Sequence, residues 1–391
     1  MNWNDKTAAN VKAIKPSGIR KFFDIATQVK GVLSLSIGEP DFAAPDKVLA
    51  AMKASLDAKE TSYTGNSGMM ELREAISHHF EQRYGVHYDP KDEILVTVGV
   101  SEGLAMALLA ITEPGDEVII PDPAYVAYPA SVELAGGTPV FVPTYPEHDF
   151  KLTVEALEKV ITPKTKAIVI GYPNNPTGTV MSAEELMPIA KFAEEHDLIV
   201  LSDEIYCELM YGDAKFTSFA KLPGMRERTV IFNGFSKAYA MTGMRLGYVC
   251  APREGLAPIL KLHQYAIMCA NTTAQVGGIT ALKECDDDVE AMRQEYDRRR
   301  KVIYKGLCDM GLPVFEPKGA FYIFPDIRYT GMTSAEFCEK LVQEEKVAVV
   351  PGTAFGDQGE GFVRISYAAS MDTIQEALKR MARFVDKYKS C

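Results

Sequence analysis

Short apolar segments alternate with amphipathic helical patterns between about residues 94 and 251, and this alternation is the strongest constraint on the fold. The segments expected to be strands buried on both faces are EILVTV, DEVIIP, KAIVIGY, LIVLSD, TVIFNG and RLGYVCA. Parallel strands need long crossover connections, which are usually helices, so the alternation predicts a mostly parallel sheet covered by helices on both faces. The sequence therefore favours an α/β fold for this region.

One crossover helix can be placed in the segment SAEELMPIAKFAEEHD. Ser182 and Glu185 have the spacing of a capping box, and the apolar residues that follow recur at helical spacing. Pro188 lies inside this pattern, and because proline has no N–H to donate, we expect a bend or a later helix start there.

The pattern changes after about residue 285. A charged helix is followed by separated strand candidates, GAFYIFPDI, KVAVVPG and GFVRISYA, and by two further helices, which is an α+β arrangement. The first 45 or so residues contain no crossover unit. We therefore predict a large domain over residues 46–285, and a smaller α+β domain made by residues 286–391 together with an N-terminal arm and segment, residues 1–45.

Composition excludes several classes of function. The 391 residues carry 42 basic and 53 acidic side chains, a net charge of −11, which gives no general attraction to nucleic acid or anionic lipid. No segment approaches the roughly 20 apolar residues of a membrane helix, and the N-terminus lacks the apolar core of a signal peptide. The 7 cysteines have no metal-ligand spacing, so no metal site is predicted. We expect a soluble cytoplasmic protein with free thiols.

Polar and aromatic residues follow five of the predicted strands, in the segments GVSEG, DPAY, PNNPTG, DEIY and SKAY. Sites in open α/β sheets form beyond the carboxyl ends of the strands, so these segments are expected to converge on one edge. Each also has a plain structural explanation: caps, turns or core tyrosines could account for Ser101, Asn175, Asp203, Tyr125 and Tyr206.

Lys237 and Arg245 lie in a stretch, IFNGFSKAYAMTGMRLGY, that otherwise looks buried. Both could belong to ion pairs. A buried ammonium is costly, however, and a lysine whose pKa is lowered by burial is a nucleophile that can form Schiff bases. Together, the segments at this edge describe a receptacle for a flat aromatic molecule with a phosphate, a protonatable ring nitrogen and an aldehyde.

The chain resembles the pyridoxal-phosphate-dependent aminotransferases of class I/II, in the aspartate aminotransferase superfamily. The matching segments occur in order between residues 36 and 369: SIGEPDF, SYTGNSGMMELREAI, PDPAYVAY, GYPNNPTG, SDEIY, FSKAYAMTGMRLGY, PKGAFYIFP and FVRISYA. The resemblance implies fold type I of the pyridoxal-phosphate enzymes, with the cofactor in the large domain.

The resemblance also implies roles at the cofactor ring. Lys237 would form the internal aldimine with pyridoxal 5'-phosphate and then move a proton between the substrate and the cofactor. Asp203 would pair with the pyridinium nitrogen, so that the ring acts as an electron sink. Tyr206 and Asn175 would hydrogen-bond the ring 3-oxygen, and Tyr125 would stack on the ring face.

The cofactor phosphate would be held by Arg245 and by the Gly99-Val100-Ser101 loop, through its backbone N–H groups and the Ser101 hydroxyl. Tyr63 would reach the phosphate of a neighbouring subunit, which implies an obligate homodimer with shared active sites. Three positions depart from many relatives: Gly234 stands where a phosphate-binding serine is frequent, Met244 where tryptophan is frequent, and Val100 where small residues are frequent, although the N–H of Val100 is still available.

The substrate α-carboxylate would be bound by Arg364, helped by Asn175 and by the backbone at Gly38. A strand-edge salt bridge is the alternative for Arg364. Residues 15–24 are expected to line the entrance, where Arg20 is either a side-chain ligand or one half of a surface ion pair.

The function implied is transamination between an α-amino acid and a 2-oxo acid by a ping-pong mechanism, with aspartate or a broad, including aromatic, range of donors. One alternative is a pyridoxal-phosphate-dependent C–S β-lyase of the same fold. A more remote alternative is a non-catalytic protein that uses this fold to sense an effector.

Overall fold

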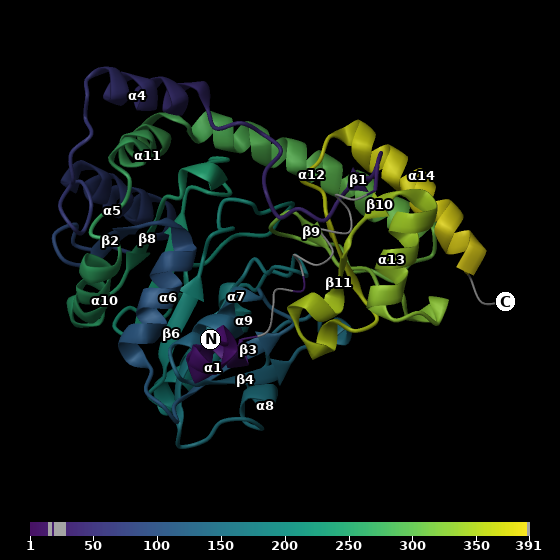
Figure 1. Ribbon diagram of the computed structural model, residues 1–391, viewed down its shortest axis with the longest axis horizontal. Coiled ribbons are helices and arrows are strands. Elements are labelled where there is room, and N and C mark those ends of the chain that lie inside the picture. The colour runs from purple at the N-terminus through teal and green to yellow at the C-terminus, as the bar shows by residue number, and fades with distance from the viewer. Residues whose placement is uncertain (15–17, 19–28, 389–391) are drawn as a thin grey trace.

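The computed structural model of the chain describes residues 1–14, 18 and 29–388. Within these residues a seven-stranded sheet forms the larger part of the molecule, at the left of Figure 1, in the order β2-β8-β7-β6-β5-β3-β4. Its strands are β2 (Ile94–Thr97), β3 (Glu117–Asp122), β4 (Thr138–Pro143), β5 (Thr165–Ile170), β6 (Ile199–Asp203), β7 (Thr229–Gly234) and β8 (Gly247–Cys250).

The prediction of a mostly parallel sheet is confirmed, with two differences. β8 runs antiparallel to both of its neighbours, β7 and β2. The connection from β7 to β8 contains one short turn of 3₁₀ helix (Thr242–Met244) and no crossover helix, so the chain reverses direction there. β4 was not predicted; it pairs with β3 at the edge of the sheet, most of its residues are exposed or half-buried, and two of them are prolines.

Helices cover both faces of this sheet, and successive residues of the central strands belong to different apolar clusters. Leu95, Val118 and Val169 pack with α6 (Gly99–Ile111), α7 (Ala127–Leu134) and α10 (Arg253–Ala266). Ile119 and Ile168, one residue away on the same strands, pack in the cluster of α9. Burial on both faces explains why these strands are continuously apolar in sequence.

α9 (Ala183–Glu195) carries the predicted capping box, in which Ser182 accepts from the Glu185 N–H and Glu185 accepts from the Ser182 N–H. The prediction of a later helix start at Pro188 is wrong, because the helix begins at Ala183 and the proline lies inside it. The cap at Ser182 fixes the start of the helix, while Pro188 removes a single hydrogen bond one turn later.

The remaining helices of the larger part are α4 (Asp46–Asp57), α5 (Met70–Tyr84), α8 (Val154–Leu157) and α11 (Thr272–Glu284). α4, α5 and α11 pack together at the end of the sheet where β2 and β8 lie (Figure 1). Two short N-terminal helices, α1 (Trp3–Lys6) and α2 (Ala9–Ala13), precede them, and α2 packs against α7.

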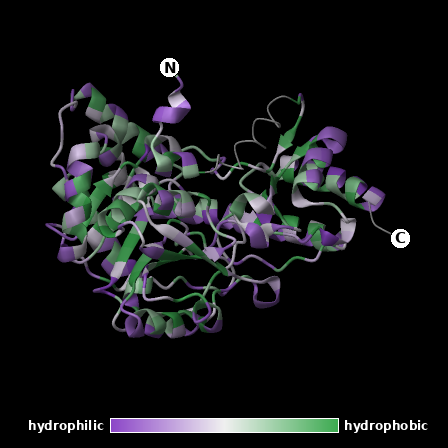
Figure 2. Ribbon diagram, turned by 60° about the horizontal axis from the view of Figure 1, so that its bottom comes forward, coloured by the Kyte–Doolittle hydropathy of each residue, from purple (hydrophilic) through white to green (hydrophobic). Residues whose placement is uncertain are grey.

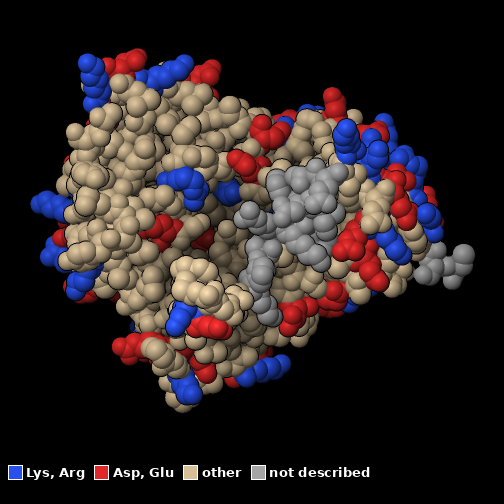
Figure 3. Space-filling view, viewed as in Figure 1, with Lys and Arg blue, Asp and Glu red and all other residues tan. Residues whose placement is uncertain are grey.

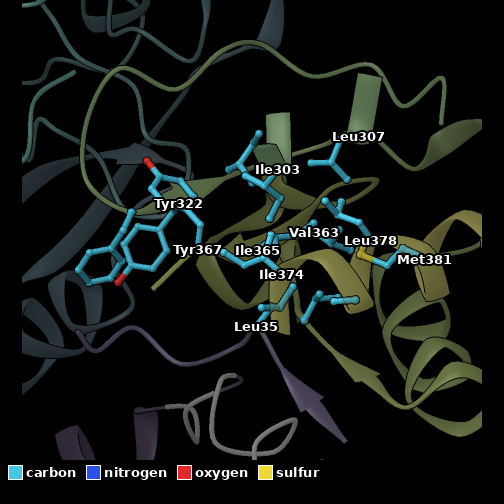
Figure 4. Close-up of a cluster of buried hydrophobic side chains, with 14 of the residues drawn as sticks. Leu35, Ile303, Leu307, Tyr322, Val363, Ile365, Tyr367, Ile374, Leu378 and Met381 are labelled. Carbon is cyan, nitrogen blue, oxygen red and sulfur yellow. The ribbon is translucent and has the colours of Figure 1, made fainter. Parts of the chain in front are cut away.

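The smaller part, at the right of Figure 1, is built from short strands and three helices of the described chain. These are β1 (Leu33–Ser34), β9 (Tyr322–Ile323), β10 (Val347–Ala348), β11 (Val350–Pro351), β12 (Val363–Ser366), α12 (Asp286–Asp309), α13 (Ser334–Glu345) and α14 (Met371–Tyr388). β1 pairs with β10, so an N-terminal segment joins elements more than 300 residues later. Figure 4 shows the apolar core that holds this part together, in which Leu35 belongs to one cluster with side chains of α12, β12 and α14.

Apolar residues concentrate on the strands of the large sheet in Figure 2, while hydrophilic residues mark the outer turns of the helices. Across residues 1–14, 18 and 29–388, none of the helices combines the length and the apolar character needed to cross a membrane. The exact division of the chain at residues 45/46 and 285/286 stays a prediction.

Candidate active site

A cavity of about 380 Å³ lies at the carboxyl ends of the large-sheet strands and extends to β9 and β12 of the smaller part. This volume is in the range of small-molecule sites. The face drawn in Figure 3 is hollowed between the two parts of the molecule, with basic and acidic side chains around the hollow. The structure brings most predicted site residues to this cavity: Gly38, Val100, Ser101, Tyr125, Asn175, Asp203, Tyr206, Lys237, Arg245 and Arg364.

A larger hollow, of about 720 Å³, lies elsewhere and contains none of these residues. Two of its lysines, Lys151 and Lys318, are paired with Glu185 and Asp213 at 2.7 and 2.8 Å. Its size alone does not make it the better candidate, because two of its three lysines are already paired with carboxylates of the same surface.

Lys237 follows the end of β7 and is half-buried in the cavity wall. Its Nζ donates to the carbonyl oxygen of Gly38 at 2.6 Å. Burial and the nearby charge of Arg364 lower the pKa of Lys237 to about 8, against the opposing fields of Glu39 and Asp203. More of this amine is therefore unprotonated near neutral pH than in an ordinary lysine, and the unprotonated form is the one that attacks a carbonyl carbon.

Asp203 is the last residue of β6, and its carboxylate is buried. Tyr128 donates its hydroxyl to Oδ2 at 2.8 Å, and the N–H of Ile205 donates to Oδ1 at 3.2 Å. Burial raises the pKa of Asp203 above its usual value, while these two donors and Lys237 favour the charged form. Sequence reasoning missed Tyr128; the signal was a second tyrosine three residues after Tyr125 in PDPAYVAY.

Three backbone segments meet at one end of the cavity, at Gly99, Gly234 and Gly247. A Cβ added to Gly234 would lie 2.8 Å from the Cα of Gly247, and a Cβ on Gly247 would lie 2.7 Å from the carbonyl carbon of Gly99. Gly234 and Gly247 are also directly paired between β7 and β8. No side chain therefore fits between these strands at Gly234.

Arg245 lies against the same segment, since a Cβ on Gly99 would be 2.6 Å from its Nη2. Its Nη1 donates to the carbonyl oxygen of Thr242 at 3.1 Å. The expectation that the segment around Arg245 is buried is wrong at this residue, which is exposed. Arg245 follows a 3₁₀ turn, in the left-handed conformation at φ 51°, and this geometry turns it out of the strand interior.

Arg364, in the middle of β12, is 2% exposed. Its Nη1 donates to Asn175 Oδ1 at 2.9 Å and its Nη2 to the carbonyl oxygen of Ser36 at 2.6 Å. The guanidinium carbon lies 4.5 Å from the ring centre of Tyr322 and 4.8 Å from that of Phe355. The alternative of a strand-edge salt bridge is not what the structure has, because both oxygens that Arg364 contacts are uncharged.

Two other arrangements complete the cavity. The hydroxyls of Tyr206 and Tyr322 lie 2.8 Å apart and share a hydrogen bond. Thr242 donates to Glu39 at the rim. Sequence reasoning missed Tyr322, Ser36 and Glu39 as site residues, although all three lie in quoted segments.

One predicted site residue is not in the cavity of this chain. Tyr63 is 79% exposed and lies outside the residues that line it. Arg20, the speculative side-chain ligand, lies outside the described residues.

Comparison with known proteins assigns the family. The model of aminotransferase class I and II matches residues 30–381, which is most of the chain. The chain belongs to the class I and II aminotransferases. Like other members, it has fold type I of the pyridoxal-phosphate enzymes, and members of this family use pyridoxal phosphate.

The chain matches named aminotransferases over nearly the full length of both proteins. An aspartate aminotransferase of Pyrococcus abyssi is 50% identical, with 96% of this chain and 97% of the relative covered. The aromatic-amino-acid aminotransferase 2 of Thermococcus litoralis is 47% identical, with 97% and 98% covered. The crystal structure of an aromatic aminotransferase from Pyrococcus horikoshii superposes with a TM-score of 0.90 at 49% identity, covering 94% and 99%. The chain is therefore an aminotransferase, and the β-lyase and effector-sensing alternatives are not favoured.

Proposed function

We propose that this aminotransferase carries pyridoxal 5'-phosphate attached covalently to Lys237, and moves an amino group between an α-amino acid and a 2-oxo acid by a ping-pong mechanism. The observation that carries the proposal is the position of Lys237. Its amine, with a pKa of about 8, shares one cavity with a buried carboxylate, Asp203, and a buried guanidinium, Arg364.

The residues present fit this cofactor. At one end of the cavity, α6 begins at Gly99 with free backbone N–H groups, the Ser101 hydroxyl and the Arg245 guanidinium nearby. A helix N-terminus and an arginine suit a phosphate dianion. The close approach of Gly99, Gly234 and Gly247 leaves this end without side chains that would fill it. Val100 contributes its N–H to the same end.

When bound, the cofactor supplies an electron sink for the pair left on the substrate α-carbon. The buried carboxylate of Asp203 would hold a proton on the ring nitrogen, and the ring would give a cationic partner to a group whose burial disfavours its charge. Tyr125 would pack on the ring, and Tyr206 and Asn175 would orient its oxygen. The Lys237 amine, once free, would take the proton from the substrate α-carbon and deliver it to the cofactor carbon that had been joined to the lysine.

Arg364 binds the α-carboxylate. Its Nε is buried and has no hydrogen-bond partner among the described residues, and Asn175 and Ser36 hold its other two nitrogens in a fixed plane. A planar fork with an unused donor suits a substrate carboxylate. Asn175 and the backbone at Gly38 complete that subsite.

We propose a broad range of donors that includes aromatic amino acids and aspartate. Among the described lining residues, the cations Lys237, Arg245 and Arg364 already have roles, and much of the rest is aromatic or apolar, such as Leu104 and Ile205. Relatives named for aromatic amino acids and for aspartate are similarly close to this chain. A panel of amino donors with 2-oxoglutarate, followed through the cofactor spectrum, ranks them.

We propose that the active unit is a cytoplasmic homodimer, in which Tyr63 reaches the cofactor phosphate of the partner. Tyr63 and Tyr265 are 79% and 91% exposed, an unusual state for large aromatic side chains. Tyr265 lies in the last turn of α10, and Thr272, at the start of the following helix α11, donates to the carbonyl oxygen of Ser62, next to Tyr63, at 2.8 Å. Sedimentation of the wild type and of Tyr63→Phe tests the assembly and the hydroxyl separately; a monomer with full activity would contradict it.

The test of the whole proposal is Lys237→Ala. We expect loss of the absorbance of the lysine–cofactor linkage and collapse of turnover, with the fold retained. A variant with near-normal kcat would overturn the assignment. Release of pyruvate and ammonia without an acceptor 2-oxo acid would instead favour the β-lyase.

A further inference from the structure

Asp122 is a second buried carboxylate at the end of a large-sheet strand, outside the cavity. It is the last residue of β3 and is 5% exposed. Its Oδ2 accepts hydrogen bonds from the backbone N–H groups of Asp357, at 3.1 Å, and of Gln358, at 3.4 Å. Both donors belong to the short 3₁₀ helix Asp357–Gly359 of the smaller part, so this side chain ties the two parts together.

The fit around Asp122 is tight and specific. Its Oδ1 is buried and has no hydrogen-bond partner among the described residues. Gly356 packs against this oxygen in a left-handed conformation at φ 137°, and a Cβ at that position would lie 1.8 Å from Oδ1. The loop before the 3₁₀ helix is therefore shaped to the carboxylate, and it accepts the carboxylate only because residue 356 has no side chain.

The segment held by Asp122 leads directly to the substrate end of the cavity. Two residues after Asp122, the N–H of Ala124 donates to the carbonyl oxygen of Phe355 at 2.9 Å. The ring of Phe355 lies 4.8 Å from the guanidinium carbon of Arg364. Tyr125, which lines the cavity, follows Ala124. The hydrogen bonds of Asp122 and Ala124 to residues 355–358 are called the clamp here. The clamp connects the strand end that bears Tyr125 with the Phe355 ring that lies against Arg364.

We propose that Asp122 is a positioning residue for transamination: its carboxylate holds the 355–358 segment so that Phe355 fixes the guanidinium of Arg364 for the substrate α-carboxylate. This inference rests on the proposed function and adds a residue that touches neither substrate nor cofactor. Its effect is on the affinity for the amino acid, because Arg364 acts in binding.

The charge of the clamp responds to pH in an accessible range. Burial raises the pKa of Asp122 to about 6, and the neighbouring carboxylate of Asp357 adds to this, while the two backbone donors oppose it. Asp357 is the charged group that bears on Asp122 among the described residues packed around it. The two backbone donors favour the ionised carboxylate even though burial disfavours it, so these two hydrogen bonds weaken when Asp122 is protonated below about pH 6.

The test compares Asp122→Asn with the wild-type holoenzyme across pH 5 to 8.5, using one aromatic donor. The asparagine keeps the shape and one acceptor oxygen but no charge, so it imitates the protonated wild type at every pH. We expect its KM to be about 3- to 10-fold higher than that of the wild type at pH 8 and equal to it at pH 5. The kcat ratio stays within about twofold throughout, because the interaction acts in binding.

Asp357→Asn is the matched control. This substitution removes the negative charge next to Asp122. It leaves the hydrogen bond in place, because Asp357 donates to Asp122 through its backbone N–H and not through its exposed side chain. The pH at which the wild-type KM rises should fall in this variant. 3-Phenylpropanoate is a carboxylate that cannot react. In each of the three proteins, its dissociation constant should vary with pH in the same way as the KM of that protein.

A KM ratio for Asp122→Asn that is constant with pH, or a fall in kcat that matches the rise in KM, overturns the inference. If Asp122→Asn does not fold, the shift in Asp357→Asn decides, and its absence also overturns the inference. Failure of the proposed function is distinct from both results: the wild type would then lack the Lys237-dependent cofactor absorbance altogether.

Discussion

Asp203 and Asp122 occupy equivalent places in the large sheet and face different surroundings. Each is the last residue of a parallel strand, β6 or β3, and each is less than one-tenth exposed. Burial raises the pKa of both carboxyl groups. Asp203, however, faces the cavity and accepts from a tyrosine hydroxyl, whereas Asp122 accepts two backbone N–H groups from the smaller part of the molecule.

Both buried carboxylates lie at the same edge of the sheet. Their roles differ because different parts of the molecule lie over the ends of β6 and β3. Over β6 the cover is an open cavity, so the charge of Asp203 is available to a ligand. Over β3 the cover is protein backbone, so the charge of Asp122 is used to hold the 355–358 segment. Substitutions that remove charge alone should therefore have very different effects at the two positions.

The largest expected difference is between Asp203→Asn and Asp122→Asn. Asp203→Asn removes the charge that would hold a proton on the ring nitrogen, and we expect kcat to fall by about 10² to 10³. Steady-state kinetics at pH 8, with the cofactor absorbance as the check on loading, measures both variants. Equal losses of kcat at the two positions would contradict the distinction drawn between them.

Arg364 lies where the two regions meet, since it contacts Asn175 beside the cavity and Phe355 on the clamped segment. We expect Arg364→Lys to raise KM for the amino donor by about 10²-fold, because a lysine cannot reproduce the planar fork. kcat should fall less than KM rises. The control is Arg228→Lys, at an arginine that pairs with Asp197 away from the cavity and should leave KM unchanged.

Much of the larger part could be predicted from sequence, because its central strands are buried on both faces and therefore continuously apolar. β4 escaped because it is an edge strand with two prolines and partly exposed residues. The direction of β8 escaped because an apolar run does not encode whether a strand is parallel or antiparallel. In both cases the missing information lies in the connections and the neighbours of the strand, and not in its own residues.

At the site, residues at strand ends could be anticipated, because topology brings strand ends together. Tyr322 and Ser36 could not, since they come from segments far apart in the chain whose packing depends on the smaller part. Asp122 could not either: DPAY drew attention to its tyrosine, and nothing in the sequence indicates that residues 357 and 358 cover the aspartate.

An effect of intermediate size is expected from a substitution at Gly234, beside the phosphate end of the cavity. In Gly234→Ser, the added Cβ would lie 2.8 Å from Gly247 Cα and 2.9 Å from the carbonyl oxygen of Leu246. Backbone cannot move as a side-chain tip does, so we expect a loss of about 1 to 3 kcal/mol in the free energy of unfolding. Cofactor affinity should also fall. Thermal unfolding and spectral titration with pyridoxal phosphate measure the two effects, and a variant that binds the cofactor more tightly would contradict this account.

The smallest effect expected is that of Tyr128→Phe, which removes the hydroxyl donor to Asp203. Because burial raises the pKa of Asp203, ionisation of that carboxyl weakens the fold as the pH rises, and Tyr128 offsets part of this loss. Loss of the hydroxyl should therefore cost about 1 kcal/mol in unfolding free energy at pH 8, and less at pH 5, where more of the carboxyl is protonated. kcat should fall by about 3- to 10-fold, because the charge facing the ring is less well stabilised.

Tyr172→Phe is the matched control for Tyr128→Phe. The Tyr172 hydroxyl is also buried, accepts from the Leu152 N–H at 3.1 Å and donates to the Phe150 carbonyl oxygen at 3.3 Å, but it contacts no carboxylate of the cavity. We expect a loss of stability of about the same size, 1 kcal/mol, that does not vary between pH 5 and 8, with kcat unchanged. If both variants lose stability equally at both pH values, Tyr128 is an ordinary core tyrosine, and Asp203 draws its support from the backbone alone, as Asp122 does.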